Sequence, residues 1–562
     1  MNPLESRRLF GTDEALAESL ELRAGSLIAR LRGTRLGPVT CEGHEVWHGI
    51  DFLYRDADWG TPAPAVDSLE HSQSADAFRA RLRGSIAAAE IAFEIHIEAD
   101  VRSVRYEATA TMASDLATNR TGIVLMHPLA VCGRRVDVEH TDGRLSMSTF
   151  PTLIAPWPPF TLVRAVRHEY ADGAWASCRF AGEDFELEDQ RNNADASFKT
   201  YSRSNLMPRP YVLRAGTVLR QSVTLRIEST PAVRREREGR PVRVRIGEIA
   251  GALPSIGTAL SGADLRAAEK HASALRALAP AHLQLCLEAG QAVDALALGG
   301  LLDAAENAAL HLEIRGLAEK DASAQLAYIA KSLEPIVPHA VAVFPSTTPV
   351  LAAARRAFPQ CRIGGGTPFF FTQLNRIEDL GACDFLCFGT AAVVHGADDE
   401  EIMAGLQSLP AMTATLRERH GEVPVHVGPS GIGAWRSPLG AQPASDGTRR
   451  LALARRDPRT RGLYGAAWAV GYIAQFAQAG AQAITLFDLT EGPVPAFDVL
   501  RRITQGTRWR RCESSDPASI AVLALEGATL LANLRDTAVD VKLDGPAGSA
   551  PIRIDPYETL IA

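Results

Sequence analysis

Hydrophobic and polar residues alternate in short runs along the first part of the chain, up to residue 240. Segments such as AFEIHIEADVRSVRYEATATM and VLRQSVTLRIE place apolar side chains at every second position, a period typical of a strand with one buried face. Turn pairs such as Asp142-Gly143 and Asp172-Gly173 separate these runs. Many short strands with such punctuation predict a β-sandwich-like domain.

From Leu253 onward the pattern changes, and continuous apolar runs alternate with alanine-rich amphipathic segments. Strands that are buried on both faces give the former, and helices with one apolar face give the latter. Eight apolar runs within about 250 residues favour a closed (β/α)8 TIM barrel over an open doubly wound sheet. The runs lie near Leu253, Leu283, Leu310, Ala340, Cys361, Asp384, Val423 and Ala483.

The tail after residue 507 returns to short strand-like runs such as IAVLALEGATLLANL. We therefore predict a multidomain α/β plus β protein in three parts. These are an N-terminal β-rich domain over 1–240, a (β/α)8 barrel over 241–506 and a small C-terminal β domain over 507–562. The charged, aperiodic stretch RREREGRPVR at 234–243 is the expected linker between the first two.

Composition and charge narrow the function class. The chain has 562 residues, of which 46% are hydrophobic, and a net charge of −7, so it lacks the basic character that nucleic acid attracts. Its opening is charged, and no run approaches the roughly 18 apolar residues of a membrane span. We expect a cytoplasmic protein with reduced cysteines, no nucleic-acid partner and no membrane contact. No set of side chains has metal-ligand spacing, so no metal or other cofactor is expected, and the oligomeric state stays open.

Polar residues that follow the predicted barrel strands are candidates for chemistry, because the active sites of such barrels lie at the carboxyl ends of the strands. His395 suits acid–base work, since imidazole titrates near neutral pH, although a structural histidine fits the sequence equally well. Asp398 begins an acidic run before a helix, where carboxylates also stabilise the N-terminus. The other candidates are Asn375, Arg376 and Asp488.

The predicted barrel lacks two familiar hydrolytic arrangements. Retaining glycosidases need two carboxylates about 5 Å apart, and in the large barrel class of those enzymes they follow the fourth and seventh strands. Here these strands end in FPSTTP and VGPSGIG. The Gly-x-Ser-x-Gly elbow of serine hydrolases is also missing, so hydrolysis of an ester would rely on activated water.

The densest polar segment lies in the N-terminal domain and reads FELEDQRNNADASFKTY, residues 185–201. If FELED continues a strand, Glu186 and Glu188 share one face of it. Carboxylates close to Arg191 and Lys199 could activate a water and polarise a carbonyl. A loop with surface ion pairs would give the same composition.

This segment resembles a string of the D-apionate lactonase family, EMEDQRNWTDAS followed by an aromatic residue and KTY. The chain departs from it at Asn193, where the family has Trp, and at Ala194, where it has Thr. Asp488 stands where the family has Glu. The likeness spans nearly the whole chain and includes Arg55-Asp56, Trp59-Gly60-Thr61, Asn119-Arg120-Thr121-Gly122, His127-Pro128, Val138-Glu139-His140, Gly364-Gly365-Gly366-Thr367, Leu374-Asn375-Arg376 and Val394-His395.

The resemblance implies a hydrolase that opens the five-membered lactone of a branched-chain sugar acid to the free aldonate, in carbohydrate catabolism. The expected small-molecule partner is D-apionolactone or a related aldonolactone. The departures at Asn193 and Ala194 put the substrate in question, because aromatic rings pack against sugars.

On this basis we expect a composite site in which segment 185–201 lies over the mouth of the barrel. Glu188 is the expected general base on water, with Glu186 or Asp189 as its alternative. Arg191 or Lys199 would stabilise the oxyanion, and His395 would protonate the leaving alkoxide. The residues expected to hold the sugar are Asn375, Arg376, Asp398 and Asp488.

Two other function classes remain open from the sequence. The first is a glycosidase, of the inverting type, that uses Asp488 with Glu288 or with a carboxylate from a loop. The second is a carbohydrate-binding protein that has lost its activity, which the departures at Asn193 and Ala194 would fit.

Overall fold

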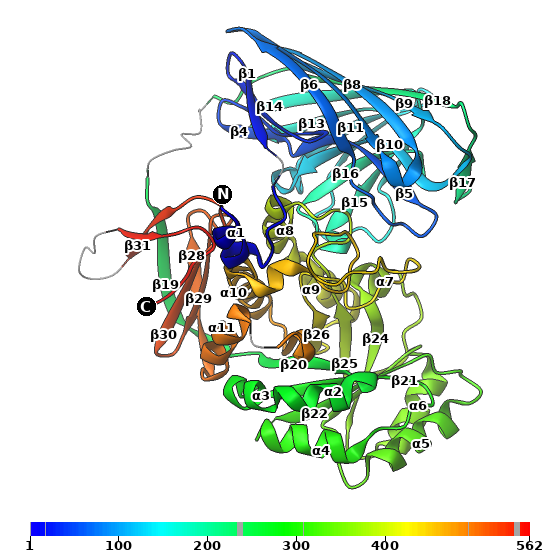
Figure 1. The fold of residues 1–562 in the computed structure, drawn as a ribbon, viewed down its shortest axis with the longest axis vertical. Coiled ribbons are helices and arrows are strands. Elements are labelled where there is room, and N and C mark those ends of the chain that lie inside the picture. The colour runs from blue at the N-terminus through cyan, green and yellow to red at the C-terminus, as the bar shows by residue number, and fades with distance from the viewer. Residues whose placement is uncertain (1, 17, 233–239, 307, 493, 545–550) are drawn as a thin grey trace.

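The computed structural model describes residues 2–16, 18–232, 240–306, 308–492, 494–544 and 551–562. Figure 1 shows a large strand-rich unit, blue to cyan, above a barrel that runs from green to orange, with a smaller sheet beside the barrel. The predicted fold class, α/β plus β in several units, is confirmed. Most of the expected linker lies outside the described residues, at 233–239. In the part of the chain that is described, no helix is long and apolar enough to cross a membrane.

The N-terminal unit is one continuous antiparallel sheet within the described residues. Two runs of neighbouring strands, β6-β7-β8-β9-β18-β14 and β15-β16-β10-β5-β3-β2-β1, are joined through β13. Alternate side chains of these strands are buried in a core of their own, as the period of two predicts. The strands are β1 Ser19–Ala24, β2 Leu27–Arg32, β3 Arg35–Cys41, β4 His44–Trp47, β5 Gly49–Asp56, β6 Ala65–Gln73, β7 Ala77–Ile86, β8 Ile91–Asp100, β9 Ser103–Met112, β10 Leu116–Pro128, β11 Arg135–His140, β12 Leu145–Thr149, β13 Phe160–Ala171, β14 Ala174–Ala181, β15 Phe185–Asp189, β16 Ser197–Ser202, β17 Tyr211–Leu213 and β18 Val218–Ile227.

Each of the eight apolar runs is a strand of the closed parallel barrel that the described residues form. The barrel closes where β20 pairs with β27, and the strands are buried on both faces, which explains their unbroken hydrophobic sequences. They are β20 Ser255–Ser261, β21 His282–Glu288, β22 Ala309–Arg315, β23 Ala340–Val343, β24 Arg362–Phe370, β25 Phe385–Gly389, β26 Val425–Ser430 and β27 Ala483–Asp488.

The segments between barrel strands form helices that pack around it. Their apolar faces and the outward-facing strand residues make up the largest hydrophobic core of the described molecule. The helices are α2 Leu265–Ala268, α3 Ala272–Leu278, α4 Ala295–Ala304, α5 Ala322–Leu333, α6 Thr348–Ala357, α7 Phe371–Asn375, α8 Asp399–Gly405, α9 Leu409–His420, α10 Leu463–Gln478 and α11 Pro495–Thr504.

The third unit is a sheet in the order β32-β31-β19-β28-β29-β30-β33. One of its strands, β19, comes from the range assigned to the barrel, and it pairs with β28 and β31. Its charged, alternating sequence VRVRIGEIAGA suits an open sheet better than a barrel interior. The strands are β19 Val242–Ala252, β28 Arg508–Ser514, β29 Ile520–Leu525, β30 Ala528–Asn533, β31 Val539–Asp544, β32 Ile552–Ile554 and β33 Thr559–Ile561.

The first helix, α1 (Pro3–Phe10), also lies away from the unit to which its position in the chain assigned it. Leu9 and Phe10 are buried in the barrel core, and the Phe10 ring lies 5.9 Å from Tyr464 and 5.4 Å from Tyr557, centroid to centroid. Burial of these two apolar side chains explains the position of the helix. The three residue ranges therefore remain a prediction. In the structure, β19 belongs to the third sheet and α1 packs on the core of the barrel.

The N-terminal sheet rests on the mouth of the barrel, where the carboxyl ends of the strands lie. Thr372 in α7 donates to the carbonyl of Asn192 at 2.9 Å, and Asn375 donates to the carbonyl of Ile154 at 3.1 Å. Thr415 in α9 accepts from the backbone of Ile154 at 2.9 Å. These buried hydrogen bonds fix the sheet over the barrel.

Candidate active site

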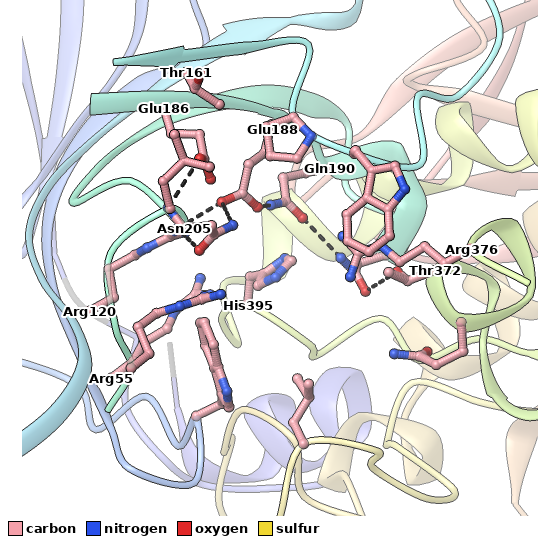
Figure 2. Close-up of a pocket in the computed structure, with 18 residues that line it drawn as sticks. Arg55, Arg120, Thr161, Glu186, Glu188, Gln190, Asn205, Thr372, Arg376 and His395 are labelled. Carbon is pink, nitrogen blue, oxygen red and sulfur yellow. Dashed lines mark hydrogen bonds and ion pairs between the residues drawn. The ribbon is translucent and has the colours of Figure 1, made fainter. Parts of the chain in front are cut away.

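A cavity of about 500 Å³ lies between the N-terminal sheet and the mouth of the barrel. Figure 2 shows the side chains that face it. Strands β5, β10 and β15 contribute from one side, and α7 and the loops after β25 and β26 contribute from the other. The lining residues are Arg55, Trp59, Arg120, Trp157, Pro158, Thr161, Glu186, Glu188, Gln190, Asn193, Asn205, Leu206, Arg209, Thr372, Gln373, Arg376, His395 and Leu439.

The alternation of β15 explains why two glutamates reach the cavity. Phe185 and Leu187 are buried in the core of the sheet, so Glu186 and Glu188 point to its opposite face. Pairing with β16 fixes the register and sets Glu188 opposite Lys199. The strand ends at Asp189, whose side chain caps the 3₁₀ helix Gln190–Asn193.

Glu188 is held as an anion. Its Oε1 accepts from Arg120 at 2.7 Å and from Asn205 at 3.0 Å, and its Oε2 accepts from Gln190 at 2.6 Å. Burial opposes its ionisation, but the charge and hydrogen bond of Arg120 outweigh that and lower its pKa to about 2. A carboxylate with so low a pKa is a weak base.

Glu186 has the opposite character, although it is only two residues away. Burial, and then the negative charge of Glu188, raise its pKa to about 7. Its Oε2 accepts from Ser204 at 2.9 Å and from the backbone of Asn205 at 3.0 Å. Its Oε1 is buried and has no hydrogen-bond partner among the described residues. One face of β15 thus carries an ionised and a readily protonated carboxyl group.

His395 faces the cavity from the loop after β25 and is oriented by the N-terminal segment. Its Nδ1 donates to Asp195 Oδ2 at 2.6 Å, and Lys199 donates to the same oxygen at 2.6 Å. Burial lowers the pKa of His395 to about 4, although Asp195 acts in the other direction. The imidazole is therefore neutral at pH 7, and its Nε2 is left as an acceptor.

A second hydrogen-bonded chain links the two sides of the cavity, as the dashed lines in Figure 2 show. Gln190 holds Glu188 with its amide nitrogen and accepts from Asn193 at 2.9 Å. Asn193 in turn accepts from Thr372 of α7 at 2.7 Å. Asn193 therefore has a polar role that the tryptophan of the family string could not fill in the same way.

Four arginines among the described residues line this cavity. Arg55 and Arg120 are buried and lie over the ring of Tyr201, at 5.1 and 4.1 Å from its centroid. Arg209 and Arg376 lie nearer to solvent. Two glutamates, one of them with a raised pKa, face these cations, so the cavity is positively charged.

Sequence comparisons identify the family to which this architecture belongs. Residues 7–230 match the N-terminal domain of D-apionate lactonase, and residues 256–508 match its TIM barrel domain. The chain belongs to the D-apionate lactonase family. A curated relative, the D-apionate lactonase of Brucella anthropi, is 33% identical, with 99% of each chain covered. The predicted family is confirmed, as is the prediction of an enzyme of the ester-hydrolysing, lactonase type.

Solved structures resemble this member of the D-apionate lactonase family only loosely. A putative aldose 1-epimerase from Escherichia coli K12 is 12% identical, with 38% of this chain and 99% of that chain covered and a TM-score of 0.27. A GH30 endoxylanase from Clostridium papyrosolvens is 12% identical, with 57% and 96% covered and a TM-score of 0.36. Scores at this level do not establish a shared fold.

Several residues predicted for the site do not line this cavity of the lactonase-family member. Asp189 and Arg191 are buried and pair with each other at 2.7 Å, and Arg191 also donates to the carbonyls of residues 151–153. These bonds tie the segment to the loop before β13, so neither side chain lines the cavity. Asp189 and Arg191 are close to Glu188 in sequence, and this suggested that they share its site. The strand ends at Asp189, however, so the alternation that directs Glu186 and Glu188 to the cavity does not continue to Arg191.

Lys199, Asn375 and Asp398 do not line the cavity either. Lys199 pairs with Asp195 and acts behind His395. Asn375 is buried and donates to Asn192 Oδ1 at 3.0 Å. Asp398 caps α8 and pairs with Arg32 at 3.1 Å. Asp398 is therefore the N-cap residue of this helix, a position that carboxylates favour.

Asp488 lies at a separate, small cavity, where it pairs with Arg455 at 2.8 Å. Glu288 is exposed and pairs with Arg436 at 2.5 Å and Arg315 at 3.2 Å. Neither carboxylate lines the large cavity, and this removes the support for the glycosidase alternative built on them.

Of the predicted residues, Glu186, Glu188, Arg376 and His395 line the cavity. Sequence reasoning missed Asp195 as a partner of His395, and it missed the cations of β5 and β10. A signal was present, because Arg55 and Arg120 both lie in segments that resemble the family. Asn205 and Arg209 stand in an irregular loop after β16, where no periodicity marks them.

Among the described residues, no group of three or more histidine, cysteine, aspartate or glutamate side chains is placed to hold a metal ion. The side chains that converge on the cavity are instead a histidine, two glutamates and arginines. These groups can activate water and stabilise negative charge.

Proposed function

We propose that this chain hydrolyses a sugar-acid lactone, D-apionolactone or a related aldonolactone, to the free aldonate in carbohydrate catabolism. The activity named for the Brucella anthropi relative supports the substrate class. The observation that carries the proposal is the Asp195–His395 pair, which faces a positively charged cavity of a size suited to small molecules. We place the reaction in the cytoplasm, because all eight cysteines lie in the described residues and are free.

In the proposed reaction His395 is the base that acts on water. Its Nε2 takes a proton while the water oxygen bonds to the carbonyl carbon of the lactone. The tetrahedral intermediate then collapses, the ring C–O bond breaks, and the imidazolium returns the proton to the leaving alkoxide. The new carboxylic acid loses its proton to solvent. Asp195 keeps the Nδ1–H tautomer and stabilises the transient imidazolium.

This assignment changes the role first expected for Glu188. Its ion pair with Arg120 lowers its pKa to about 2, about two units below that of His395, so it is the weaker base. Glu186 has a higher pKa, about 7, but it is completely buried, so we do not assign it the role of the base. We propose that Glu188 positions Arg120 and accepts hydrogen bonds from lactone hydroxyls. Arg120 and Arg55 then face the carbonyl oxygen and stabilise its negative charge, a contribution typically of about 3–4 kcal/mol in other enzymes.

The test is turnover of a panel of sugar lactones by the purified protein, followed with a pH indicator and corrected for spontaneous opening. We expect hydrolysis by the wild type and a loss of about 10²–10⁴-fold in kcat for His395→Gln, with the unfolding midpoint unchanged. No turnover of any aldonolactone, or full activity of the variant, would contradict the proposal. An aryl glycoside in the same panel tests the glycosidase alternative, and lactone binding without turnover would support the inactive relative.

A further inference from the structure

Three of the four cavity arginines form no ion pair among the described residues, and two of these, Arg209 and Arg376, are exposed. Among the described residues, no carboxylate lies within ion-pair distance of Arg209 or Arg376. The guanidinium of Arg209 lies 5.1 Å from the ring centroid of Trp59. That of Arg376 lies 4.5 Å from Trp157, and its Nε donates to the carbonyl of Pro156 at 2.8 Å. Both cations are thus in direct contact with neutral groups, and neither forms an ion pair with the two cavity glutamates.

The electrostatics of the cavity agree with this geometry. Partial burial and then the charge of Arg120 lower the pKa of Arg209, Glu188 and Glu186 act in the other direction, and Arg376 makes a smaller contribution that lowers it. Partial burial also lowers the pKa of Arg376, although Glu188 and Glu186 act against this effect. Four arginines line the cavity with only two glutamates, one of which has a raised pKa, so the cavity still favours a further anion.

The negative charge formed by lactone hydrolysis does not require these two residues. Arg55 and Arg120 lie on one side of His395 in Figure 2, and Arg376 lies on the other. Arg120 is compensated by Glu188, whereas Arg55 has no carboxylate partner in the described part of the chain and is 4% exposed. The oxyanion therefore has a cation of its own on the side of Arg55.

The cavity is also larger than a five-carbon lactone needs. With one water volume of about 30 Å³ allowed for each of about ten non-hydrogen atoms, such a lactone fills roughly 300 Å³. The cavity measures about 500 Å³. Room for several further atoms remains.

We propose that the lactone turned over by this chain carries a second, anionic group, a carboxylate or a phosphate, which Arg209 and Arg376 bind. This inference rests on the proposed lactonase function, and within it the inference selects a related, anionic aldonolactone over D-apionolactone, which is neutral. Guanidinium groups form charge-assisted hydrogen bonds with both kinds of anion. The anionic group takes no part in the chemistry, because only the ring ester bond breaks, and it leaves with the product.

The experiment compares kcat/KM, at low ionic strength, for three lactones with the same ring. One is neutral, one carries a terminal carboxylate as in an aldaric acid monolactone, and one carries a terminal phosphate. We expect one of the anionic lactones to exceed the neutral one by about tenfold or more, and 0.5 M salt to reduce that ratio. Which anion gives the higher value identifies the group.

The double variant Arg209→Gln/Arg376→Gln tests the residues. It should bring the anionic-to-neutral ratio of kcat/KM close to one, mainly through KM. The matched control is Arg79→Gln, because the Arg79 side chain on β7 is 75% exposed and does not line the cavity; this variant should keep the wild-type ratio.

The outcomes separate this inference from the proposed function. Equal or faster turnover of the neutral lactone, or a ratio that survives in the double variant, overturns the inference and leaves the lactonase in place. If none of the three lactones is hydrolysed, both fail.

Discussion

At the scale of single residues, two neighbouring carboxyl groups of the cavity have very different pKa values. Glu186 and Glu188 are two positions apart on one strand, yet the pKa values lie near 7 and near 2. The difference arises because Arg120 pairs with Glu188, whereas burial dominates at Glu186. Such separation is typical of sites that run acid–base chemistry.

The pH dependence of kcat/KM should show this separation. Activity should rise as the pH increases through about 4, because His395 must lose its proton to act as a base. It should fall above about 7, when Glu186 ionises and adds negative charge close to the developing oxyanion. Initial rates measured between pH 3.5 and 8.5 test both limbs, and the upper one should shift in Glu186→Gln. A single limb near the ordinary histidine pKa of about 6.5 would contradict this account.

The variant Glu188→Gln should distinguish a positioning group from a base. The amide oxygen can still accept from Arg120 and Asn205, so we expect a loss of about tenfold in kcat. That is less than the 10²–10⁴-fold loss typical when a general base is removed, as expected for His395→Gln. Steady-state kinetics of the two variants, side by side, provide the measurement. A larger loss for Glu188→Gln would restore Glu188 as the base.

The sequence could locate part of this site but not its contacts. The β15 glutamates follow from the period of a strand, and His395 follows from its place after a barrel strand. The partner of His395, Asp195, lies 200 positions away in sequence, and no local pattern encodes that distance. The composition of the segment suggested a catalytic role for Arg191 and Lys199. The sequence does not show whether a charged side chain points into the cavity or forms a buried ion pair outside it, and both residues do the latter.

At the scale of elements, helix α8 connects the reactive loop to the N-terminal sheet. Its first turn carries Glu400 and Glu401, which pair with Arg32 at 2.8 Å and with His48 at 2.7 Å. Arg35, from β3, also pairs with Glu401. Because His395 stands shortly before this helix, the ion pairs hold its loop in place.

Removing one partner of this network should destabilise the protein. In Glu401→Gln, Arg35 is left largely buried, at 14% exposure, without its main anion, and we expect a loss of roughly 2–4 kcal/mol in the free energy of unfolding. Urea denaturation measures it. The control is Arg30→Gln, whose pair with Glu400 is 41% exposed on the arginine side and should change stability by less than about 1 kcal/mol. Equal effects of the two substitutions would contradict a buried clamp.

The elements that could be predicted are those with a strong hydrophobic pattern in the sequence. All eight barrel strands are continuous apolar runs, so their positions could be read directly. The assignment of β19 could not be, since its alternation shows a strand but not its neighbours, which lie more than 250 positions away. The position of α1 depends in the same way on a distant contact, with Tyr557.

At the scale of the whole molecule, the site exists only because two units meet. The N-terminal sheet supplies the carboxylates, two buried cations and Asp195, and the barrel supplies His395 and Arg376. Hydrogen bonds from α7 and α9 hold the two units together. We infer that the N-terminal sheet is as much a part of the catalytic centre as the barrel.

The most direct test of this central claim is a double-mutant cycle on kcat across the two units. Asp195→Asn, His395→Gln and the double variant are each assayed with the best lactone. If the two side chains act as one unit, each single variant should lose most of the activity, and the double variant should be no worse than His395→Gln. If the losses simply multiply, or if Asp195→Asn retains wild-type kcat, the two units do not share a catalytic pair and the account is wrong.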